Sequence, residues 1–244
     1  MDNVIVTGAS RGLGLAIAER LAGDGFSVVA VARRNSEAFS AAEKRLAASG
    51  RGTLTFRSLD LADTSAFPGF TRDLRREVGP IYGLVNNAAL GTAGLLATMP
   101  DAEIEALIRL NTLSPILLSK YVVRGMMAQG RGRVVNISSI IASTGYNALS
   151  VYAATKASLV GFTKSLAREV GRTGVTVNAI APGFIDTEMT HGLDEASHHR
   201  IVGRSAMRRL ATPEDVAGVA ALLMGEAGRN ITGTVMTVDA GSTA

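Results

Sequence analysis

Cysteine is absent from this chain of 244 residues, and proline is scarce, with 6 residues. The absence of cysteine excludes disulfide bonds, thiolate metal sites and cysteine nucleophiles, and with them a secreted scaffold held together by disulfides. The few prolines form no linker that would divide the chain. No run of about 18 uncharged apolar residues occurs, so we expect no transmembrane helix. No targeting signal precedes the apolar run at residues 3–6, and the cytoplasm is the expected location.

Charge of either sign is also modest. The net charge is +4, and the basic residues form no block of five or six. A nucleic-acid-binding surface is therefore not expected. A mildly basic surface suits an acidic small molecule or an acidic carrier protein better. With 47% apolar and 19% charged residues, the chain has the composition and length of one large globular domain.

Short β-branched runs alternate with longer amphipathic patterns along the whole chain. The strand-like runs lie at 4–7, 27–32, 53–59, 83–86, 133–138, 176–181 and 234–238. The helical patterns lie at 12–25, 36–49, 64–78, 101–129, 152–172 and 212–225. This alternation predicts an α/β fold, a single doubly wound Rossmann-type domain over residues 1–244, whose seven-stranded parallel sheet has helices on both faces. The least regular stretch, 183–211, predicts a substrate lid around 186–211.

A glycine-rich loop joins the first strand-like run to the first helical pattern. It includes Gly8, Ser10, Arg11, Gly12, Leu13 and Gly14, with the glycine spacing G-x-x-x-G-x-G. Glycines let the backbone approach a pyrophosphate, and the N-terminus of the following helix presents free N–H groups and its positive dipole end to that anion. The loop therefore predicts a dinucleotide site. The alternative is a tight turn without a ligand.

The end of the second strand distinguishes NAD from NADP. An NAD site places a carboxylate there for the ribose hydroxyls, whereas this chain has Arg33 and Arg34. Guanidinium groups match the oxygens of a 2′-phosphate, and Arg11 can approach that phosphate from the glycine loop. We therefore predict NADP(H) as the cofactor. The alternative is a solvated basic start of a helix.

Tyr152 and Lys156 are four residues apart in a helical pattern, so both project from one face. A lysine ammonium one turn away favours the tyrosinate and lowers the tyrosine pKa toward neutrality. Tyr152 can then donate a proton to a carbonyl oxygen as hydride arrives. Such a pair taken alone is more often a surface pair, and the upstream glycine loop favours the catalytic interpretation.

Two serines lie where the fifth strand ends, at the edge where doubly wound sheets bind ligands. The hydroxyl of Ser139 can hydrogen-bond the substrate carbonyl and the developing alkoxide, and Ser138 is its neighbour with the same chemistry. This reaction needs no metal. The histidines at 191, 198 and 199 do not converge on one helical face, and we predict no metal site.

Taken together, these residues resemble the short-chain dehydrogenase/reductase family. The resemblance rests, in chain order, on Thr7–Gly14, the Asn-Asn-Ala-Ala segment at 86–89, Asn111, Ser139, Tyr152 with Lys156, and Pro182-Gly183. Within the family, residues 177–189 and 231–233 are most similar to bacterial 3-oxoacyl-acyl-carrier-protein reductases of fatty acid synthesis. The resemblance implies NADPH-dependent reduction of a carbonyl to a secondary alcohol.

The resemblance also implies roles that the residue types alone do not. Its serine-to-tyrosine spacing selects Ser139 over Ser138, and Asn111 bends its helix and orders a water near Lys156, which also holds the nicotinamide ribose. It assigns further cofactor contacts to Asp60, Leu61, Asn87, Ala88, Pro182, Gly183, Ile185 and Thr187. For Asp60 the alternative is a helix N-cap. It implies a homotetramer built by the helices 101–129 and 152–172, and an outer face of these helices includes Leu113, Leu117, Leu118, Leu159 and Phe162.

The expected substrate side is apolar. Ser139, Leu149, Tyr152 and Phe184 are the predicted substrate contacts, with Leu90, Tyr146 and Met189 beside them. Leu149 stands where the nearest relatives often have glutamine, and residues 90–96 lack their Arg-Asp pair. An acyl-carrier-protein thioester is the expected substrate form, and Arg131, Arg133 and Arg172 are candidate carrier contacts. The alternatives are a carbonyl reductase or alcohol dehydrogenase for another small ketone, an NAD-dependent oxidising dehydrogenase, and a nucleotide-sensing regulator without turnover.

Overall fold

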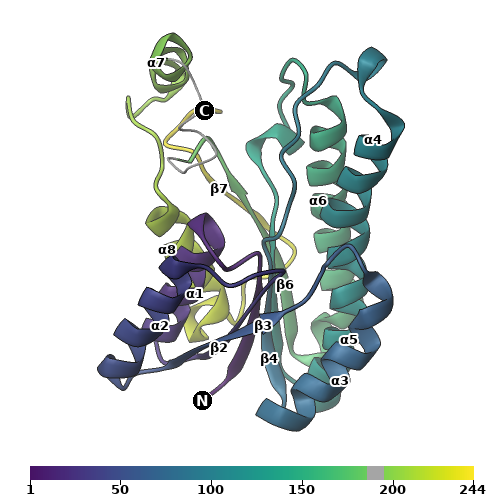
Figure 1. Cartoon of the computed structure of the whole chain (residues 1–244), viewed down its shortest axis with the longest axis vertical. Coiled ribbons are helices and arrows are strands. Elements are labelled where there is room, and N and C mark those ends of the chain that lie inside the picture. The colour runs from purple at the N-terminus through teal and green to yellow at the C-terminus, as the bar shows by residue number, and fades with distance from the viewer. Residues whose placement is uncertain (186–194) are drawn as a thin grey trace.

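The computed structural model describes residues 1–185 and 195–244, with side chains in the second range described from residue 199 onward. Within these residues, seven parallel strands form one sheet in the order β3-β2-β1-β4-β5-β6-β7 (Figure 1). The strands are β1 (Asn3–Thr7), β2 (Ser27–Ala32), β3 (Thr53–Ser58), β4 (Ile81–Asn86), β5 (Gly132–Ile137), β6 (Val175–Pro182) and β7 (Val235–Val238). The predicted sheet is confirmed.

Because every strand is parallel, all strands end along one side of the sheet, which we call the carboxyl edge, and begin along the opposite side, the amino edge. The strand order reverses between β1 and β4. Such a switch point leaves a crevice at the carboxyl edge, and ligands of doubly wound folds bind there. A ligand site is therefore expected at the ends of β1, β4, β5 and β6.

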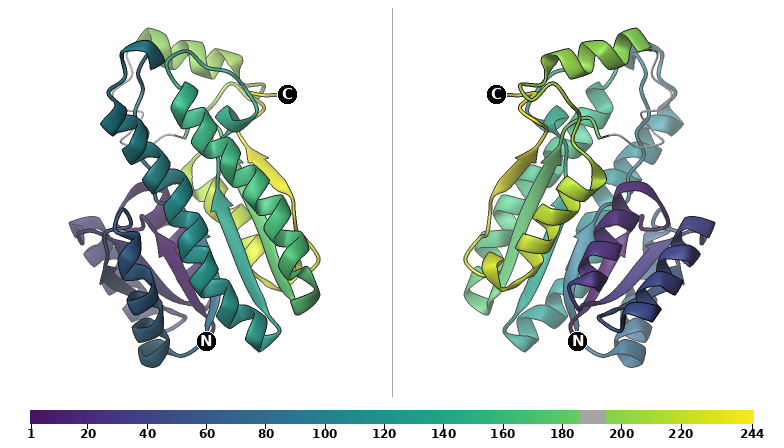
Figure 2. Two further views of the ribbon diagram at one scale, coloured as in Figure 1. Left: turned by 90° about the vertical axis from the view of Figure 1, so that its right-hand side faces the viewer. Right: turned by 90° about the vertical axis from the view of Figure 1, so that its left-hand side faces the viewer.

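Helices cover both faces of the sheet (Figure 2). One face carries α1 (Gly12–Gly23), α2 (Glu37–Ser49) and α8 (Pro213–Met224), and the other carries α3 (Phe67–Val78), α5 (Ser114–Gln129) and α6 (Ser150–Val170). The alternation along β1 shows how both cores form. Val4 and Val6 pack with the α1 side, and Ile5 packs with the α3 side, all of them buried. Strands covered on both faces require such continuous apolar runs.

Local capping explains where several helices begin. The Thr212 hydroxyl accepts a hydrogen bond from the N–H of Asp215, the Asp215 carboxylate accepts from the N–H of Thr212, and Pro213 is the first helical residue of α8. This capping box satisfies N–H groups that a helix start leaves without partners. Ser36 caps α2 through a 3.0 Å hydrogen bond from the N–H of Phe39.

The predicted helix over 101–129 is interrupted. Its observed parts are α4 (Asp101–Ile108), a π-helical turn at Arg109–Leu113, and α5. The 183–211 stretch is also more regular than its sequence pattern indicates, since it contains α7 (Glu195–Arg204). Short 3₁₀ turns lie at Thr64–Ala66, Leu96–Thr98, Ile140–Ala142, Gly171–Thr173 and Glu226–Gly228. None of the helices in the described ranges is long and apolar enough to cross a membrane.

Two residues expected on an outer helix face lie in the core instead. Leu118 is buried in the cluster between α5 and the sheet, and Leu159 of α6 is buried as well. Leu113 is exposed, and Leu117 and Phe162 are partly exposed. The periodicity of an apolar helix cannot distinguish the side that covers a sheet from the side that remains outside, because both sides contain leucine.

Candidate active site

The glycine loop between β1 and α1 is packed against the end of β4. A Cβ atom on Gly8 would lie 2.8 Å from the Cα of Ala88, and one on Gly14 would lie 2.3 Å from the carbonyl oxygen of Gly8. Gly12 differs from both, because a Cβ atom there would meet no atom within 4 Å, while its φ of 55° favours glycine. Two glycines thus permit close packing, and the third borders open space.

The start of α1 is suited to an anion. The helix begins at Gly12, and neither a capping side chain from Arg11 nor an acidic residue occupies its first turn. The N–H groups of Gly12, Leu13 and Gly14 therefore lack the usual intrahelical partners, and the helix dipole adds positive potential there. Ser10 precedes this turn. The arrangement fits the pyrophosphate of a dinucleotide.

Thr7 and Asn87 connect the two strands at the switch point. The Thr7 hydroxyl donates to the carbonyl of Val85 at 3.3 Å and accepts from the N–H groups of Asn87 and Ala88 at 2.9 and 3.1 Å. The Asn87 amide nitrogen donates to the carbonyl of Thr7 at 2.9 Å. These bonds hold the glycine loop against the chain after β4, so Asn87 and Ala88 border the predicted cofactor crevice.

The predicted adenosine side lies after β2 and β3. Arg33 and Arg34 are exposed directly beyond the end of β2, and neither forms an ion pair with another residue that the structure describes. The carboxylate of Asp60 is exposed and accepts a 2.9 Å bond from the N–H of Ala62, while Leu61 is buried. The residue that caps the following 3₁₀ turn is Asp63, so Asp60 is not its N-cap.

The side chain of Ser139 interacts with that of Tyr152 closely enough to affect its pKa. Ser139 follows β5 in an extended conformation, and Tyr152 lies in the first turn of α6. Burial raises the pKa of Tyr152, and the interaction with Ser139 partly opposes that rise. Ser138 instead donates its hydroxyl hydrogen to the main-chain carbonyl of Lys156 at 2.8 Å. The two adjacent serines therefore differ in surroundings: Ser138 is bonded to the main chain of α6, and Ser139 influences the Tyr152 hydroxyl.

Lys156 is almost completely buried, at 3% exposure. Its Nζ donates to the carbonyl of Ile137 at 2.9 Å and lies 5.7 Å from the centre of the Tyr152 ring. Burial lowers the pKa of Lys156 to about 8. In the protein alone, the loss of solvation outweighs any lowering of the Tyr152 pKa by the lysine, because burial dominates for both residues.

Asn111 lies in the π-helical turn and is buried. Its Oδ1 accepts from the N–H of Leu90 at 2.8 Å, and its Nδ2 donates to the carbonyl of Leu90 at 2.9 Å and to the hydroxyl of Thr155 at 3.2 Å. Thr155 in turn donates to the carbonyl of Tyr152 at 2.7 Å. Asn111 thus links the loop after β4 to the helix that carries Tyr152 and Lys156.

Two aromatic residues from segments distant in the chain contact each other. The rings of Tyr146 and Phe184 are 6.1 Å apart and meet edge to face. Leu149 is partly buried and directly precedes α6, and Leu90 is exposed. The residues predicted to line the substrate side therefore come from the loop after β4, the chain before α6 and the chain after β6.

The end of β6 positions the other predicted cofactor contacts. Pro182 is the last residue of β6, and a Cβ atom on Gly183 would lie 2.7 Å from the Cβ of Asp239. Ile185 is buried and pairs with Ala211 in an isolated parallel bridge. The predictions for Thr187, Met189, His191 and the side chain of His198 lie outside the described residues. Within the described part of the chain, no group of three or more His, Cys, Asp or Glu residues could hold a metal ion.

Sequence reasoning missed a buried polar network below the site. The amide nitrogen of Asn86 donates to the hydroxyl of Ser119 at 3.0 Å and to Oδ1 of Asn136 at 2.8 Å, and Asn136 donates to the hydroxyl of Thr163 at 2.9 Å. These bonds connect β4 and β5 to α5 and α6. The signal in the sequence is an asparagine near the end of each of two buried strands.

The candidate carrier contacts Arg131 and Arg133 lie at the amino edge, far along β5 from Ser139. Arg131 pairs with Asp2, and both guanidinium groups lie over the ring of Tyr82, at 4.8 and 5.4 Å from its centre. Arg172 lies in the 3₁₀ turn after α6, next to the start of β6. Within one chain, none of the three is therefore beside the candidate active site.

A doubly wound parallel sheet with a glycine loop at its switch point is the architecture of dinucleotide-binding proteins. A model of the short chain dehydrogenase family matches residues 2–198. The chain belongs to this family, and it is an oxidoreductase that acts on CH–OH or carbonyl groups.

The similarity to curated relatives covers nearly the whole chain. The chain is 39% identical over 237 residues to the 3-oxoacyl-acyl-carrier-protein reductase FabG of Escherichia coli (strain K12), and 38% identical over 238 residues to that of Vibrio harveyi, with 97% of this chain and 95% of each relative covered. A short-chain dehydrogenase/reductase from Serratia marcescens is 31% identical with a TM-score of 0.92. A blue fluorescent protein from a metagenomic library, solved in complex with NADPH, is 33% identical with a TM-score of 0.90. Each alignment with these structures covers 100% of this chain and 98% of the other.

Proposed function

We propose that this protein uses NADPH to reduce the 3-oxo group of an acyl chain carried by an acyl carrier protein. The observation that carries the reaction type is the cluster of Ser139, Tyr152 and Lys156, brought together from β5 and α6 at the carboxyl edge. The acyl-carrier form of the substrate is supported by the names of the relatives that are 38–39% identical over nearly the full length.

The cofactor supplies a hydride to the carbonyl carbon of the substrate. The Ser139 hydroxyl donates a hydrogen bond to the carbonyl oxygen and stabilises the negative charge that develops there. The Tyr152 hydroxyl donates its proton to the same oxygen. Because burial raises the pKa of Tyr152, this hydroxyl holds its proton at neutral pH, as a proton donor for the reductive direction must.

Lys156 and Asn111 support the donor from two sides. The Lys156 ammonium below the tyrosine ring stabilises the tyrosinate left by proton transfer, and it offers donors to the nicotinamide ribose. Asn111 is a positioning residue, because its polar atoms contact Leu90 and Thr155. We propose that it fixes the direction of α6 and the loop after β4, and that a water beside it returns a proton toward Lys156.

The residues that would hold the cofactor follow the crevice at the switch point. The pyrophosphate would bind at the glycine loop and the start of α1. The adenosine side would contact Asp60, Leu61, Asn87 and Ala88. The nicotinamide would contact Pro182, Gly183, Ile185 and Thr187. Arg33 and Arg34 would bind the 2′-phosphate, since no ion pair with another described residue occupies either guanidinium group.

A second candidate substrate class is a smaller ketone. The observation that favours it is the edge-to-face contact of Tyr146 with Phe184 beside Leu149, which makes an apolar surface without a charged group of its own. Leu149, Phe184, Ser139 and Tyr152 would contact either kind of substrate.

Initial rates of NADPH oxidation test the substrate. We expect acetoacetyl-acyl carrier protein to give a higher kcat/KM than the acetoacetyl thioester of a small thiol, and the thioester a higher value than simple ketones. A simple ketone that equals the carrier-bound substrate would support the second candidate. The absence of turnover with every carbonyl would contradict the proposed reaction.

The cofactor preference has a separate test. Arg33→Ala combined with Arg34→Ala should raise the KM for NADPH by about tenfold or more and leave the KM for NADH unchanged, because charge-assisted bonds to the 2′-phosphate are lost. Arg51→Ala, a change at an exposed arginine before β3, is the matched control. An unchanged ratio of the two KM values would remove Arg33 and Arg34 from the site.

We further propose that residues 1–244 form one catalytic domain, that the segment around 186–211 closes over the substrate, and that the protein is a homotetramer. The exposed apolar residues Ile108 of α4, Leu113 of the π-helical turn and Met127 of α5 support an interface there. Light scattering coupled to size exclusion would measure the assembly. A monomeric mass at micromolar concentration would contradict the tetramer.

A further inference from the structure

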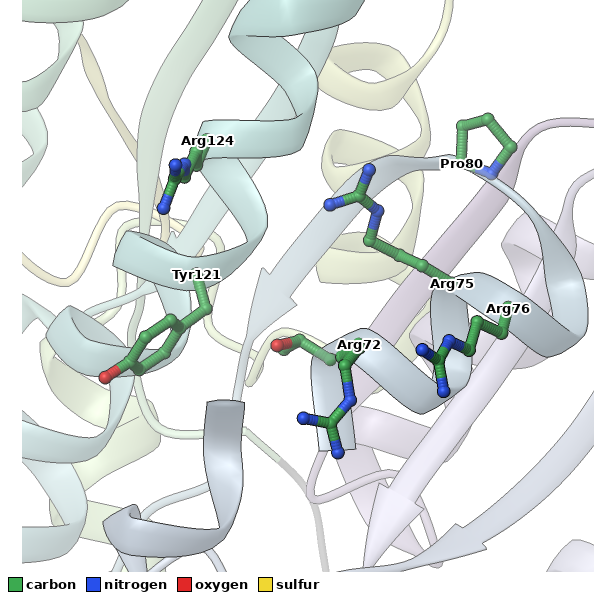
Figure 3. A pocket seen from close by; sticks show the side chains of 7 residues that line it. Arg72, Arg75, Arg76, Pro80, Tyr121 and Arg124 are labelled. Carbon is green, nitrogen blue, oxygen red and sulfur yellow. The ribbon is translucent and has the colours of Figure 1, made fainter. Parts of the chain in front are cut away.

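A second basic site lies between α3 and α5, away from the candidate active site. It is an open hollow of about 600 Å³, lined by the side chains of Arg72, Arg75, Arg76, Pro80, Tyr121 and Arg124 together with Thr71. Figure 3 shows the three arginines and the proline on one wall, with Tyr121 and Arg124 of α5 on the other. Pro80 directly precedes β4, which places the hollow toward the amino edge of the sheet.

The arginines that line this hollow carry more positive charge than the nearby carboxylates neutralise. Asp73 lies 3.1 Å from Arg72 and 4.0 Å from Arg76, and thus compensates one of these charges. Arg75 and Arg124 form no salt bridge with any residue in the described ranges. The other carboxylate of this helix, that of Glu77, pairs with Arg57. Arginine cannot relieve the mutual repulsion by losing its proton.

The guanidinium of Arg75 is held against α5. A Cβ atom on Gly125 would lie 3.5 Å from its central carbon. Because Gly125 has no side chain, the guanidinium of Arg75 can lie flat against the backbone of α5, on the same helix as Arg124. This contact limits the number of conformations that Arg75 can adopt, and an arginine that is ordered before binding loses less entropy when an anion arrives.

The other walls suit an organic group. Tyr121 and Pro80 offer apolar surface next to the arginines, and the ammonium of Lys120 lies 5.4 Å from the centre of the Tyr121 ring. Guanidinium forks match phosphate oxygens in geometry and charge. A volume of about 600 Å³ is within the range of small-molecule sites.

We propose that this hollow binds a phosphate-bearing anion with at least two negative charges, and that Arg75 and Arg124 are its principal contacts. The ligand class is a di- or polyphosphate, whose source is either the free inorganic anion or a phosphate ester with a ring that rests on Tyr121. The site is separate from the cofactor crevice, because α3 and α5 cover one face of the sheet while the glycine loop lies at the carboxyl edge.

Calorimetric titration of the NADP⁺-saturated protein tests the site, since excess NADP⁺ occupies the cofactor crevice. At about 0.1 M salt, where charge interactions over roughly 10 Å persist, we expect saturable binding of inorganic pyrophosphate and of ATP. Arg75→Gln combined with Arg124→Gln should weaken both by at least tenfold. Arg51→Gln combined with Arg229→Gln removes the same charge elsewhere on the surface and should leave both affinities within twofold.

Tyr121→Ala identifies the source of the ligand. If this substitution weakens the binding of ATP and leaves that of pyrophosphate unchanged, the ligand is the phosphate ester. If ATP and pyrophosphate bind with equal affinity both before and after the substitution, the ligand is the free anion. The proposal would be overturned if neither probe showed saturable binding, or if both double variants weakened the affinity for the probes equally. It would also be overturned if the unaltered protein bound no probe while the Arg75 and Arg124 changes caused the protein's assembly to dissociate. The last result would assign the hollow to a contact with a second copy of the chain.

Discussion

Two of the tyrosines that lie beside basic side chains occupy opposite edges of the sheet. At the carboxyl edge, Tyr152 has Lys156 at 5.7 Å from its ring centre, and at the amino edge Tyr82 has Arg131 at 4.8 Å and Arg133 at 5.4 Å. Burial raises the pKa of both tyrosines. Proximity to a cation therefore does not distinguish the candidate catalytic tyrosine from the other one.

The hydrogen-bond partners of the two hydroxyls do distinguish them. The Tyr82 hydroxyl donates to the main-chain carbonyl of Met224 at 3.1 Å, which commits its proton to a bond that supports α8. The Tyr152 hydroxyl instead interacts with the side chain of Ser139, and it forms no bond to a main-chain carbonyl of the described residues. Transfer of the Tyr152 proton to a substrate requires that the hydroxyl can exchange its present partner for the substrate oxygen.

The largest expected effect is the loss of the proton donor. Tyr152→Phe should lower kcat by about 10²- to 10⁴-fold, the usual contribution of a positioned acid, while NADPH still binds. Steady-state rates and a fluorescence titration with NADPH measure the two quantities.

Tyr82→Phe is the matched control for this substitution. It should leave kcat unchanged and lower the free energy of unfolding by about 1 kcal/mol, the typical value of one hydrogen bond. Equal losses of kcat in the two variants would contradict the distinction drawn from their hydroxyl partners.

Substitution of the two adjacent serines should have smaller effects on kcat, and the two variants should differ from each other. Ser139→Ala should reduce kcat by about 10²- to 10³-fold, because a donor to the developing oxyanion is lost. Ser138→Ala removes the bond to the Lys156 carbonyl, and we expect it to lower the free energy of unfolding by about 1–3 kcal/mol, since a buried carbonyl loses its donor. Kinetics and urea unfolding of both variants should show opposite profiles; a larger kcat loss for Ser138→Ala would reassign the roles.

The buried charge of Lys156, which the proposed reaction needs, should lower the stability of the fold. Burial lowers its pKa from 10.5 to about 8, so at pH values between these the unfolded chain binds one more proton than the folded chain, and the free energy of unfolding rises with pH across this window. Below about pH 8 the folded state carries a buried ammonium at a cost of about 3 kcal/mol.

Lys156→Met should therefore abolish turnover yet raise the free energy of unfolding at pH 7, by about 1–3 kcal/mol after the loss of the bond to Ile137. Urea unfolding at pH 7 and at pH 10 measures this gain, which should shrink at the higher pH. Lys164→Met, at an exposed lysine of the same helix, should give no such gain. A less stable Lys156→Met protein at pH 7 would show that the Lys156 charge stabilises the fold.

The smallest expected effect belongs to the amino edge. Arg131→Gln breaks an exposed ion pair with Asp2 and should change the free energy of unfolding by less than about 1 kcal/mol, with kcat/KM for a small thioester unchanged. The informative measurement is kcat/KM for the carrier-bound substrate. A drop confined to that substrate would show that the amino edge takes part in carrier docking in the assembled protein.

Local patterns in the sequence were sufficient for most of the architecture. The strand-like runs and helical patterns match the observed elements to within a few residues, because alternation of apolar residues depends on neighbours close in the chain. The exceptions are α7, which the sequence pattern did not predict, and the helix predicted over 101–129. Its π-helical turn forms where Asn111 bonds to Leu90 and Thr155, two residues more than 20 positions away.

By itself, the sequence determined that a glycine loop joins β1 to α1 and that Tyr152 and Lys156 share a helix face, because both features depend on residues only a few positions apart. Only the tertiary structure decided how far burial lowers the Lys156 pKa, and that Arg131 and Arg133 lie at the edge opposite the site. It also brought the arginines of α3 to Arg124 of α5. These properties arise from contacts and solvent exclusion between segments distant in the chain, which no local pattern encodes.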